Sequence, residues 1–245
     1  MQKIARTPTS RQARRRNDRV NKSTGARKGR VPVPAAERSL AAKAYEAIKL
    51  RVITLEYPPG SSLVESQICA ELGIGRTPVH EAISRLAIEG AVEILPRKGI
   101  VVRPVSLDEA LATIEARLIN EPACARLAAQ RASDEDLARI QDVLEQAPPL
   151  LARRDIKGLM QLDRQFHAAI ARAARNRVLE QILQQLHERS LRFWFISLSD
   201  SKHLLQVDAE HRDVLRALVA RNPDRAEQTV RAHIESFRDT IKRSI

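Results

Sequence analysis

Three histidines and one aspartate in the second half of the chain occupy positions where a divalent metal ion could bind. Asp163 and His167 are four residues apart and border the apolar face of one expected helix. His211 and His233 fall among the apolar residues of two further expected helices. Imidazole and carboxylate groups suit Zn²⁺, with Ni²⁺ or Mn²⁺ as alternatives, and burying them without partners is costly. The spacing predicts one shared metal site, and separate hydrogen-bonded core histidines are the alternative.

An all-helical unit over residues 106–245 must position these side chains. Apolar residues recur at helical spacing, and Pro148-Pro149, Arg175-Asn176 and Asn222-Pro223 mark breaks between helices. Six helices are expected, at 107–131 (with a kink at Pro122), 134–147, 151–174, 176–198, 201–221 and 223–243. His187 and His203 lack an inward-facing context in this pattern and are expected at the surface or at helix ends.

A smaller unit over residues 37–105 reads as a winged helix-turn-helix. An amphipathic helix is expected at 38–55, and a Ser62…Glu65 capping box is expected to open a second helix. Thr77 as N-cap and Pro78 at the first helical position would begin a third helix. Two short strands at 91–95 and 100–104 follow. Two helices joined by a short turn and followed by a hairpin are typical of this DNA-binding fold.

Polar side chains on the third helix and at the hairpin tip could contact DNA. The apolar residues of the helix share one side, which leaves hydroxyl, imidazole and guanidinium groups on the other. The DNA-binding candidates are Arg76, Thr77, His80, Ser84 and Arg85 on the helix, and Arg97 and Lys98 at the wing tip. The alternative for this unit is a small helical domain with ordinary solvated charges.

This segment resembles the DNA-binding domain of the GntR family of bacterial transcription regulators. The resemblance rests on Pro59-Gly60, Leu63-x-Glu65, Leu72-Gly73-Ile74-Gly75, the run from Arg76 to Leu86, and Glu89-Gly90-Ala91-Val92. In that family two arginines at the start of the recognition helix contact operator bases. The first corresponds to Arg76, and His80 replaces the second. Because a neutral imidazole offers one donor instead of a fork, the resemblance implies DNA binding with an altered base preference.

The second unit resembles the FCD domain, the C-terminal ligand-binding bundle of FadR-type GntR regulators. The matching residues are Ile114-Glu115-Ala116-Arg117, Glu121-Pro122, Asp163-x-x-Phe166-His167-x-x-Ile170, Ala174-Arg175-Asn176, Glu210-His211-Arg212 and His233. The resemblance implies a divalent metal held by Asp163, His167, His211 and His233, and a small carboxylate effector bound with help from Arg117 and Asn176. Pairing of Arg117 with Glu121 and capping by Asn176 are the alternatives. Six helices would fit the shorter VanR-like branch.

The charge of the chain is concentrated at its N-terminus. The 245 residues carry 42 Lys and Arg against 30 Asp and Glu, a formal charge of +12. Residues 1–38 contain 12 of the basic residues and 2 of the acidic ones. Residues 1–36 are therefore expected to be a disordered basic tail that binds polyanions non-specifically or only aids solubility. The hydrophobic fraction of 43% supports a real core, and the aromatic fraction of 3% favours helices.

Sequence features also restrict the class of protein. Two cysteines suit a reducing cytosol, and an apolar stretch long enough for a membrane span or a secretion signal is not apparent. We expect a cytoplasmic, homodimeric, mainly α transcription regulator that binds double-stranded operator DNA and a small carboxylate, and is not an enzyme. The alternatives are a metal-dependent hydrolase with an accessory DNA-binding domain, and a protein that coats DNA through its basic tail.

Overall fold

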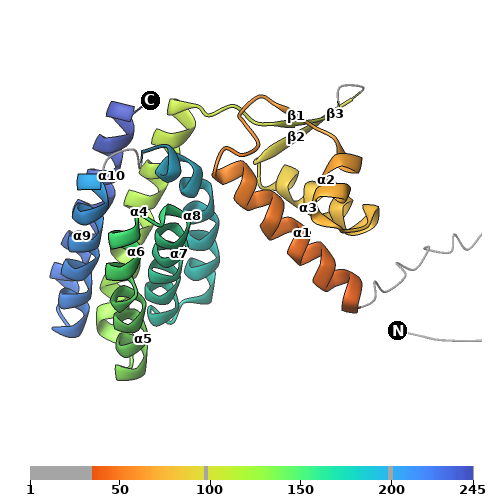
Figure 1. Ribbon diagram of the computed structural model, residues 1–245. Coiled ribbons are helices and arrows are strands. Elements are labelled where there is room, and N and C mark those ends of the chain that lie inside the picture. Colours follow the sequence, from red (N-terminus) through yellow and green to blue (C-terminus); the bar gives the residue numbers. More distant parts are fainter. Residues whose placement is uncertain (1–34, 97–98, 198–200, 245) are drawn as a thin grey trace, which may run out of the picture. The chain divides into compact units, whose positions relative to one another are not determined.

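The computed structural model describes residues 35–96, 99–197 and 201–244 (Figure 1). The expected basic tail lies outside these residues except for Ala35 and Ala36, which begin the first helix. The wing-tip candidates Arg97 and Lys98 also lie outside them. None of the helices searched in the described residues is long and apolar enough to cross a membrane.

The N-terminal unit is a winged helix-turn-helix, as the sequence predicts. It consists of α1 (Ala35–Ile53), β1 (Ser62–Leu63), α2 (Glu65–Leu72), α3 (Arg76–Ile88), β2 (Val92–Leu95) and β3 (Gly99–Val102). The strands form an antiparallel sheet in the order β1-β3-β2. The helices and the sheet bury a common apolar core that includes Ile48, Val52, Ile68, Val79, Ile83, Leu86, Val92 and Val102. This core fixes α3, so the polar side of the helix faces away from it.

Two expected helix starts in this unit are wrong. Ser62 does not cap α2, because it lies in β1 opposite Val101 and its backbone belongs to the sheet. Val64 is the N-cap of α2 and makes no side-chain capping bond. Likewise α3 begins at Arg76, one residue before the expected Thr77 cap, and no side chain caps it. Pairing of β1 with β3 therefore determines the role of Ser62, which the local capping pattern did not predict.

The C-terminal unit is an all-α bundle, which confirms the expected fold class. Its helices are α4 (Leu107–Arg131), α5 (Asp134–Glu145), α6 (Ala147–Arg153), α7 (Ile156–Ala173), α8 (Arg177–Ser197), α9 (Ser201–Val219) and α10 (Pro223–Ser244). Helix α10 packs against α4 and α9, and α7 packs against α4, α5 and α8 (Figure 1). Helices α4, α7, α8, α9 and α10 thereby bring residues distant in the sequence into one interior.

The described part of the bundle has seven helices instead of the expected six. The additional helix, α6, contains Pro148 and Pro149 near its start, where a missing backbone N–H costs no helical hydrogen bond. Arg154 then adopts a left-handed conformation, and the Asp155 side chain accepts a hydrogen bond from the backbone N–H of Gly158 to cap α7. The helix count therefore gives no ground for assigning the chain to the VanR-like branch. Helix α4 continues through Pro122.

Candidate metal centre and DNA-reading face

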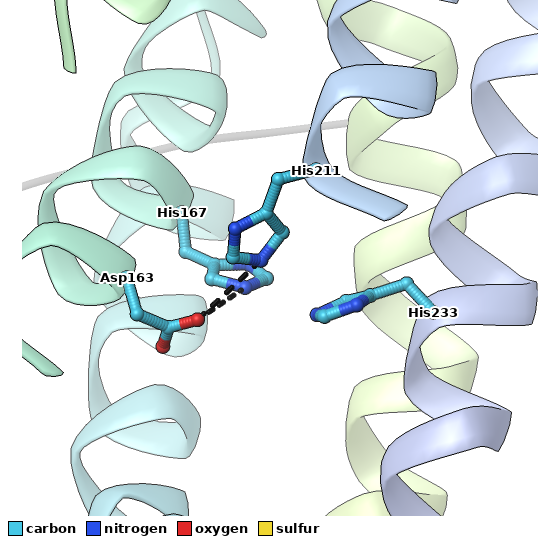
Figure 2. Close-up of side chains that lie close together, drawn as sticks. All are labelled: Asp163, His167, His211 and His233. Atoms are coloured by element: carbon cyan, nitrogen blue, oxygen red, sulfur yellow. Dashed lines mark ion pairs between the residues drawn. The ribbon is translucent and has the colours of Figure 1, made fainter. Parts of the chain in front are cut away.

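Asp163, His167, His211 and His233 converge in the interior of the bundle, as Figure 2 shows. The first two lie one turn apart on α7, and the histidines at 211 and 233 come from α9 and α10. One ligand atom from each residue lies within 4.8 Å of those of the other three. Asp163 Oδ1 is 3.4 Å from His211 Nε2 and 3.8 Å from His167 Nε2. The predicted residues thus form one compact, buried cluster.

Two carboxylates hold histidines of the cluster from outside. Glu121 Oε2 on α4 lies 3.2 Å from His167 Nδ1, and Glu210 Oε2 on α9 lies 2.8 Å from His233 Nδ1. The pKa values of Glu121 and Glu210 are below their ordinary value, since the Arg117 and His233 contacts outweigh the effect of burial. An ionised carboxylate only accepts hydrogen bonds, so each of the two Nδ1 atoms is a donor. This arrangement leaves the Nε2 lone pairs free to bind a cation.

The electrostatics of the cluster favour the protonation states that a metal requires. Burial alone would raise the pKa of Asp163, but the neighbouring imidazoles, first that of His187, hold it below its ordinary value. Burial, followed by the proximity of His233, lowers the pKa of His211 well below its ordinary value. Asp163 is therefore an anion and His211 a neutral imidazole at neutral pH, the forms that coordinate metals.

The donor set fits a divalent metal ion. The Nε2 atoms of His167 and His211 are buried and have no hydrogen-bond partner among the described residues, although both face Asp163. Leaving such atoms without a partner is costly, and a cation between them would supply one. Three imidazoles and a carboxylate are typical ligands of zinc and of other divalent transition metals.

His187 is also part of this region, and the expectation of a surface position for it is wrong. Its side chain is 7% exposed, and its Nε2 lies 3.2 Å from Asp163 Oδ2. The ring centroids of His187 and His167 are 4.7 Å apart. His203, for which a surface or helix-end position was also expected, is buried.

The two expected effector-binding residues lie in different surroundings. Arg117 is buried and forms an ion pair with Glu121, with its Nε 2.5 Å from Oε1. It therefore contacts the carboxylate that holds His167. Asn176 is exposed, and its side-chain oxygen accepts a hydrogen bond from the backbone N–H of Leu179 at the start of α8. Asn176 therefore caps α8, as the alternative interpretation predicted. It does not line either of the two cavities beside the cluster that are described below.

Sequence reasoning did not place three residues at the cluster, namely Glu121, His187 and Glu210, although it named the pairing of Glu121 with Arg117 as one alternative. Glu210 was named only as part of the Glu210-His211-Arg212 motif, and in the structure it bonds to His233. A signal for His187 existed, because it lies four residues from both Leu183 and Leu191 on the apolar face of α8. Nothing local in the sequence indicates which histidine each carboxylate would contact, since the partners come from different helices or are separated by many residues.

Two small cavities flank the cluster. The larger has a volume of about 60 Å³ and is lined by His167 and His187 together with Glu121, Cys124, Leu183 and Val230. The smaller has a volume of about 30 Å³ and a mostly apolar lining that includes Asp163, His211 and Trp194. The larger cavity, on the His187 side, also has a mainly apolar lining, and both cavities border residues of the cluster.

The exposed side of α3 carries the predicted DNA-reading residues. The side chains of Arg76 and His80 are 86% and 63% exposed, and Thr77 is also exposed. Glu65 on α2 contacts both, with its oxygens 2.7 Å from His80 Nδ1 and 3.4 Å from Arg76 Nε. The hydrogen bond with His80 lowers the pKa of Glu65. Glu65 thus holds the two side chains that correspond to the base-contacting positions of the resembled family.

Arg85 and Ser84 are less available for contact with DNA than the residues at the start of α3. The Arg85 guanidinium lies 3.6 Å from the ring centroid of Tyr45 and its Nε lies 3.1 Å from Glu89 Oε1. Ser84 is half-buried. Arg76, Thr77 and His80 therefore form the more accessible part of the predicted surface.

Two family models match the chain. Residues 40–102 match the model described as bacterial regulatory proteins, gntR family, and residues 112–236 match the FCD domain. The first match contains α2 and α3, and the second contains Asp163, His167, His211 and His233.

Curated relatives with similar sequences are transcription regulators. The chain is 37% identical over 134 residues to an uncharacterised HTH-type transcriptional regulator of Agrobacterium vitis, covering 54% of this chain and 78% of that protein. It is 27% identical to the Nta operon transcriptional regulator of Aminobacter aminovorans, covering 77% and 88%. It is 26% identical to the galactonate operon transcriptional repressor of Escherichia coli, covering 78% and 92%.

Solved structures share the fold at low sequence identity. Escherichia coli McbR/YncC superimposes with a TM-score of 0.74 at 20% identity, covering 83% of this chain and 97% of that one. A putative GntR transcriptional regulator from Rhodococcus sp. RHA1 gives a TM-score of 0.71 at 20% identity, covering 84% and 99%. These similarities concern the arrangement of the elements and not the ligands.

Proposed function

Since the chain belongs to the GntR family of DNA-binding transcriptional regulators and carries an FCD domain, we propose that a small organic acid controls its affinity for operator DNA. The acid binds at or beside a divalent metal in the helical bundle. The observation that carries this proposal is the convergence of Asp163, His167, His211 and His233 on one buried point. These four residues hold the ion, with zinc as the first candidate and nickel or manganese as alternatives.

A bound divalent ion would supply a Lewis-acidic position for a carboxylate oxygen. Within the chain, Glu121 and Glu210 orient His167 and His233, and Arg117 balances the charge of Glu121. We assign Arg117 an indirect part in effector binding, through this carboxylate. The name of the galactonate operon repressor, a relative, refers to an organic acid, which agrees with this class of effector.

Regulation requires that the acid favour one arrangement of the protein over another. A ligand with equal affinity for the DNA-bound and free arrangements would not change operator binding. We propose a homodimer that presents two winged helices to a pseudo-palindromic operator, because twofold protein symmetry matches twofold DNA symmetry. Arg76, Thr77 and His80 contact the bases, and Arg97 and Lys98 contact the backbone. As an operator-binding protein, it acts in the bacterial cytoplasm.

The hydrolase alternative is not supported by the relatives. The matching family and the named relatives are transcriptional regulators and not enzymes. Glu210, the carboxylate next to His211 in the sequence, could serve a hydrolase as a general base, but it is hydrogen-bonded to His233 Nδ1. It therefore serves to orient a histidine.

Operator binding measured with and without candidate acids tests the proposal. An operator selected from a random DNA pool is titrated with zinc-loaded protein, alone and with a panel of mono- and dicarboxylates. We expect at least one acid to shift the operator Kd, and metal removal by a chelator to abolish that shift. An operator Kd unaffected by every acid, in protein that contains stoichiometric metal, would contradict the proposal.

A further inference from the structure

We propose that Glu65 makes His80 a hydrogen-bond acceptor toward DNA, so that this position of α3 reads the exocyclic amine of adenine or cytosine and not guanine. The inference concerns the position at which this chain has a histidine and the resembled family has an arginine. It rests on the proposed function, because it names the class of base that the DNA-reading face selects there.

The contact between Glu65 and His80 decides which ring nitrogen carries the proton. Glu65 Oε1 lies 2.7 Å from His80 Nδ1, and this hydrogen bond holds the pKa of Glu65 below its ordinary value. An ionised carboxylate only accepts hydrogen bonds, so Nδ1 is the donor. A neutral imidazole has a single N–H, which leaves a lone pair on Nε2. The one donor of His80 is therefore directed at the protein and not at DNA.

The other ring nitrogen is available to a base. The side chain of His80 is 63% exposed, whereas that of Glu65 is 19% exposed. Nε2 is the ring nitrogen farther from the main chain, so it is the one that can reach a base edge while Nδ1 stays on Glu65. The second oxygen of the carboxylate, Oε2, lies 3.4 Å from Arg76 Nε. Glu65 is thus held through both of its oxygens, which keeps the orientation of the imidazole defined.

Arg76 keeps the opposite preference. Its contact with Glu65 uses Nε, and the terminal nitrogens of the guanidinium remain for a bidentate contact with guanine. The two side chains are four residues apart, roughly 6 Å along the helix, which corresponds to about two base-pair steps. The base that His80 reads should therefore lie about two base pairs from the guanine that Arg76 reads.

The major groove distinguishes a donor from an acceptor on the protein. Guanine presents N7 and O6, which are both acceptors, so the lone pair of Nε2 would face a second lone pair there. Adenine N6 and cytosine N4 carry amines that can donate to Nε2. An arginine, which has only donors, makes the reverse choice. Replacing arginine by a histidine held through Nδ1 therefore exchanges guanine for a base with an amine.

Substitutions at position 80 locate the base. Full-length protein selects an operator from a random DNA pool at pH 8, above the range in which histidine normally takes up a proton. Kd values are then measured for every base-pair change in one half-site. We expect the wild type to favour adenine or cytosine over guanine by roughly tenfold at one position. His80→Ala should lose this discrimination, and His80→Arg should favour guanine there.

Base analogues test the hydrogen bond itself. Purine in place of the adenine, or 2-pyrimidinone in place of the cytosine, removes the amine and should weaken wild-type binding by roughly fivefold. Binding by His80→Ala should lose less, and the difference is the contribution of the pair. 7-Deazaguanine at the position read by Arg76 is the control, because loss of N7 should weaken binding by the wild type and not by Arg76→Ala.

Glu65 is the positioning residue, and its test is the discrimination between bases. Glu65→Ala should reduce the preference for the amine by roughly fivefold, because nothing then directs the N–H of His80 away from DNA. Glu65→Gln should retain most of it, since the amide oxygen also accepts. Glu71→Ala is the matched control on α2, because Glu71 contacts Arg51 and Tyr57 instead. A structural role alone would weaken binding to all sequences equally.

Several results would overturn the inference. They are a guanine preference at the position that His80 controls, unchanged discrimination in His80→Ala, insensitivity to loss of the amine, and unchanged discrimination in Glu65→Ala. If the Glu65 variants do not fold, the ring ¹⁵N signals of His80 in the wild-type complex decide. A proton on Nδ1 and a lone pair on Nε2 support the inference, and a proton on Nε2 overturns it.

The selected operator also separates this inference from the proposed function. If organic acids leave its Kd unchanged while His80 selects an amine, the proposed function fails and the inference stands. If the acids shift its Kd while the position read by His80 prefers guanine, the inference fails and the proposed function stands.

Discussion

The polar groups of the winged helix and those of the bundle are held in opposite ways. On α3, Arg76 and His80 are mostly exposed and share one carboxylate, Glu65, from the neighbouring helix. In the bundle, Asp163 and His211 are buried, with partners from several helices. Water can solvate the first set, whereas the second set depends entirely on its neighbours.

This difference explains what each set can do. Exposed groups keep atoms in contact with water, and these atoms can take a base or a phosphate as a partner at little cost. Buried groups with fixed partners cannot rearrange freely, so they present a pre-organised site to an ion or a small ligand. Substitutions should therefore affect the two regions independently, and the following predictions test that separation.

The largest effect is expected from His211→Ala. Removing one of four ligands should lower metal affinity by roughly 100-fold or more, beyond the effect of losing an orienting group. Elemental analysis of purified protein should fall from about one divalent ion per chain to almost none. Retention of the metal in this variant would reject the ligand set. Glu145→Gln, which alters an exposed side chain at the end of α5, should leave the content unchanged.

Arg76→Ala should weaken specific operator binding by roughly 10-fold to 100-fold, the equivalent of one bidentate base contact. Circular dichroism and metal content should remain those of the wild type, since the side chain is exposed. Footprinting on the selected operator measures the loss. Arg216→Ala, which removes an exposed arginine of the bundle, is the charge-matched control. An unchanged footprint in Arg76→Ala would contradict the assignment of α3 as the reading helix.

Glu210→Gln should have a smaller effect on the metal than loss of a ligand. The amide no longer fixes His233 through an ionised acceptor, so metal affinity should fall by about tenfold. Competition with a chelator of known affinity measures the change. Operator binding by the fully loaded variant should match that of the wild type. Metal affinity equal to that of the wild type would show that the carboxylate does not orient the histidine.

The smallest effect concerns pH and the metal-free protein. The folded pKa of His211 lies well below its unfolded value of about 6.5, so the unfolded chain binds more protons at acidic pH. The free energy of unfolding should therefore fall between pH 7.5 and 5.5, by at most about 1.4 kcal/mol from this histidine. Urea unfolding with a chelator present measures this slope. His211→Asn should reduce the slope, and an equal slope would assign the pH dependence to other groups.

The sequence alone predicted much of the molecule. Apolar periodicity located the helices to within a few residues, because burying one face of a helix is a local requirement. Helical spacing and motif resemblance both placed Arg76 and His80 on the third helix and named the four clustered residues. The capping pattern was wrong at Ser62, which joins a sheet, and the interpretation of two prolines as a break missed α6.

What the sequence determined by itself was therefore the type of each region: a winged helix with an exposed polar face, and a bundle with inward histidines. Tertiary structure alone decided the partners. Glu121 reaches His167, Glu210 reaches His233, and His187 faces Asp163 and a cavity, although a surface position was expected for it. The physical reason is that local periodicity fixes which face of a helix is buried, whereas the groups that meet there depend on how separate helices pack against one another.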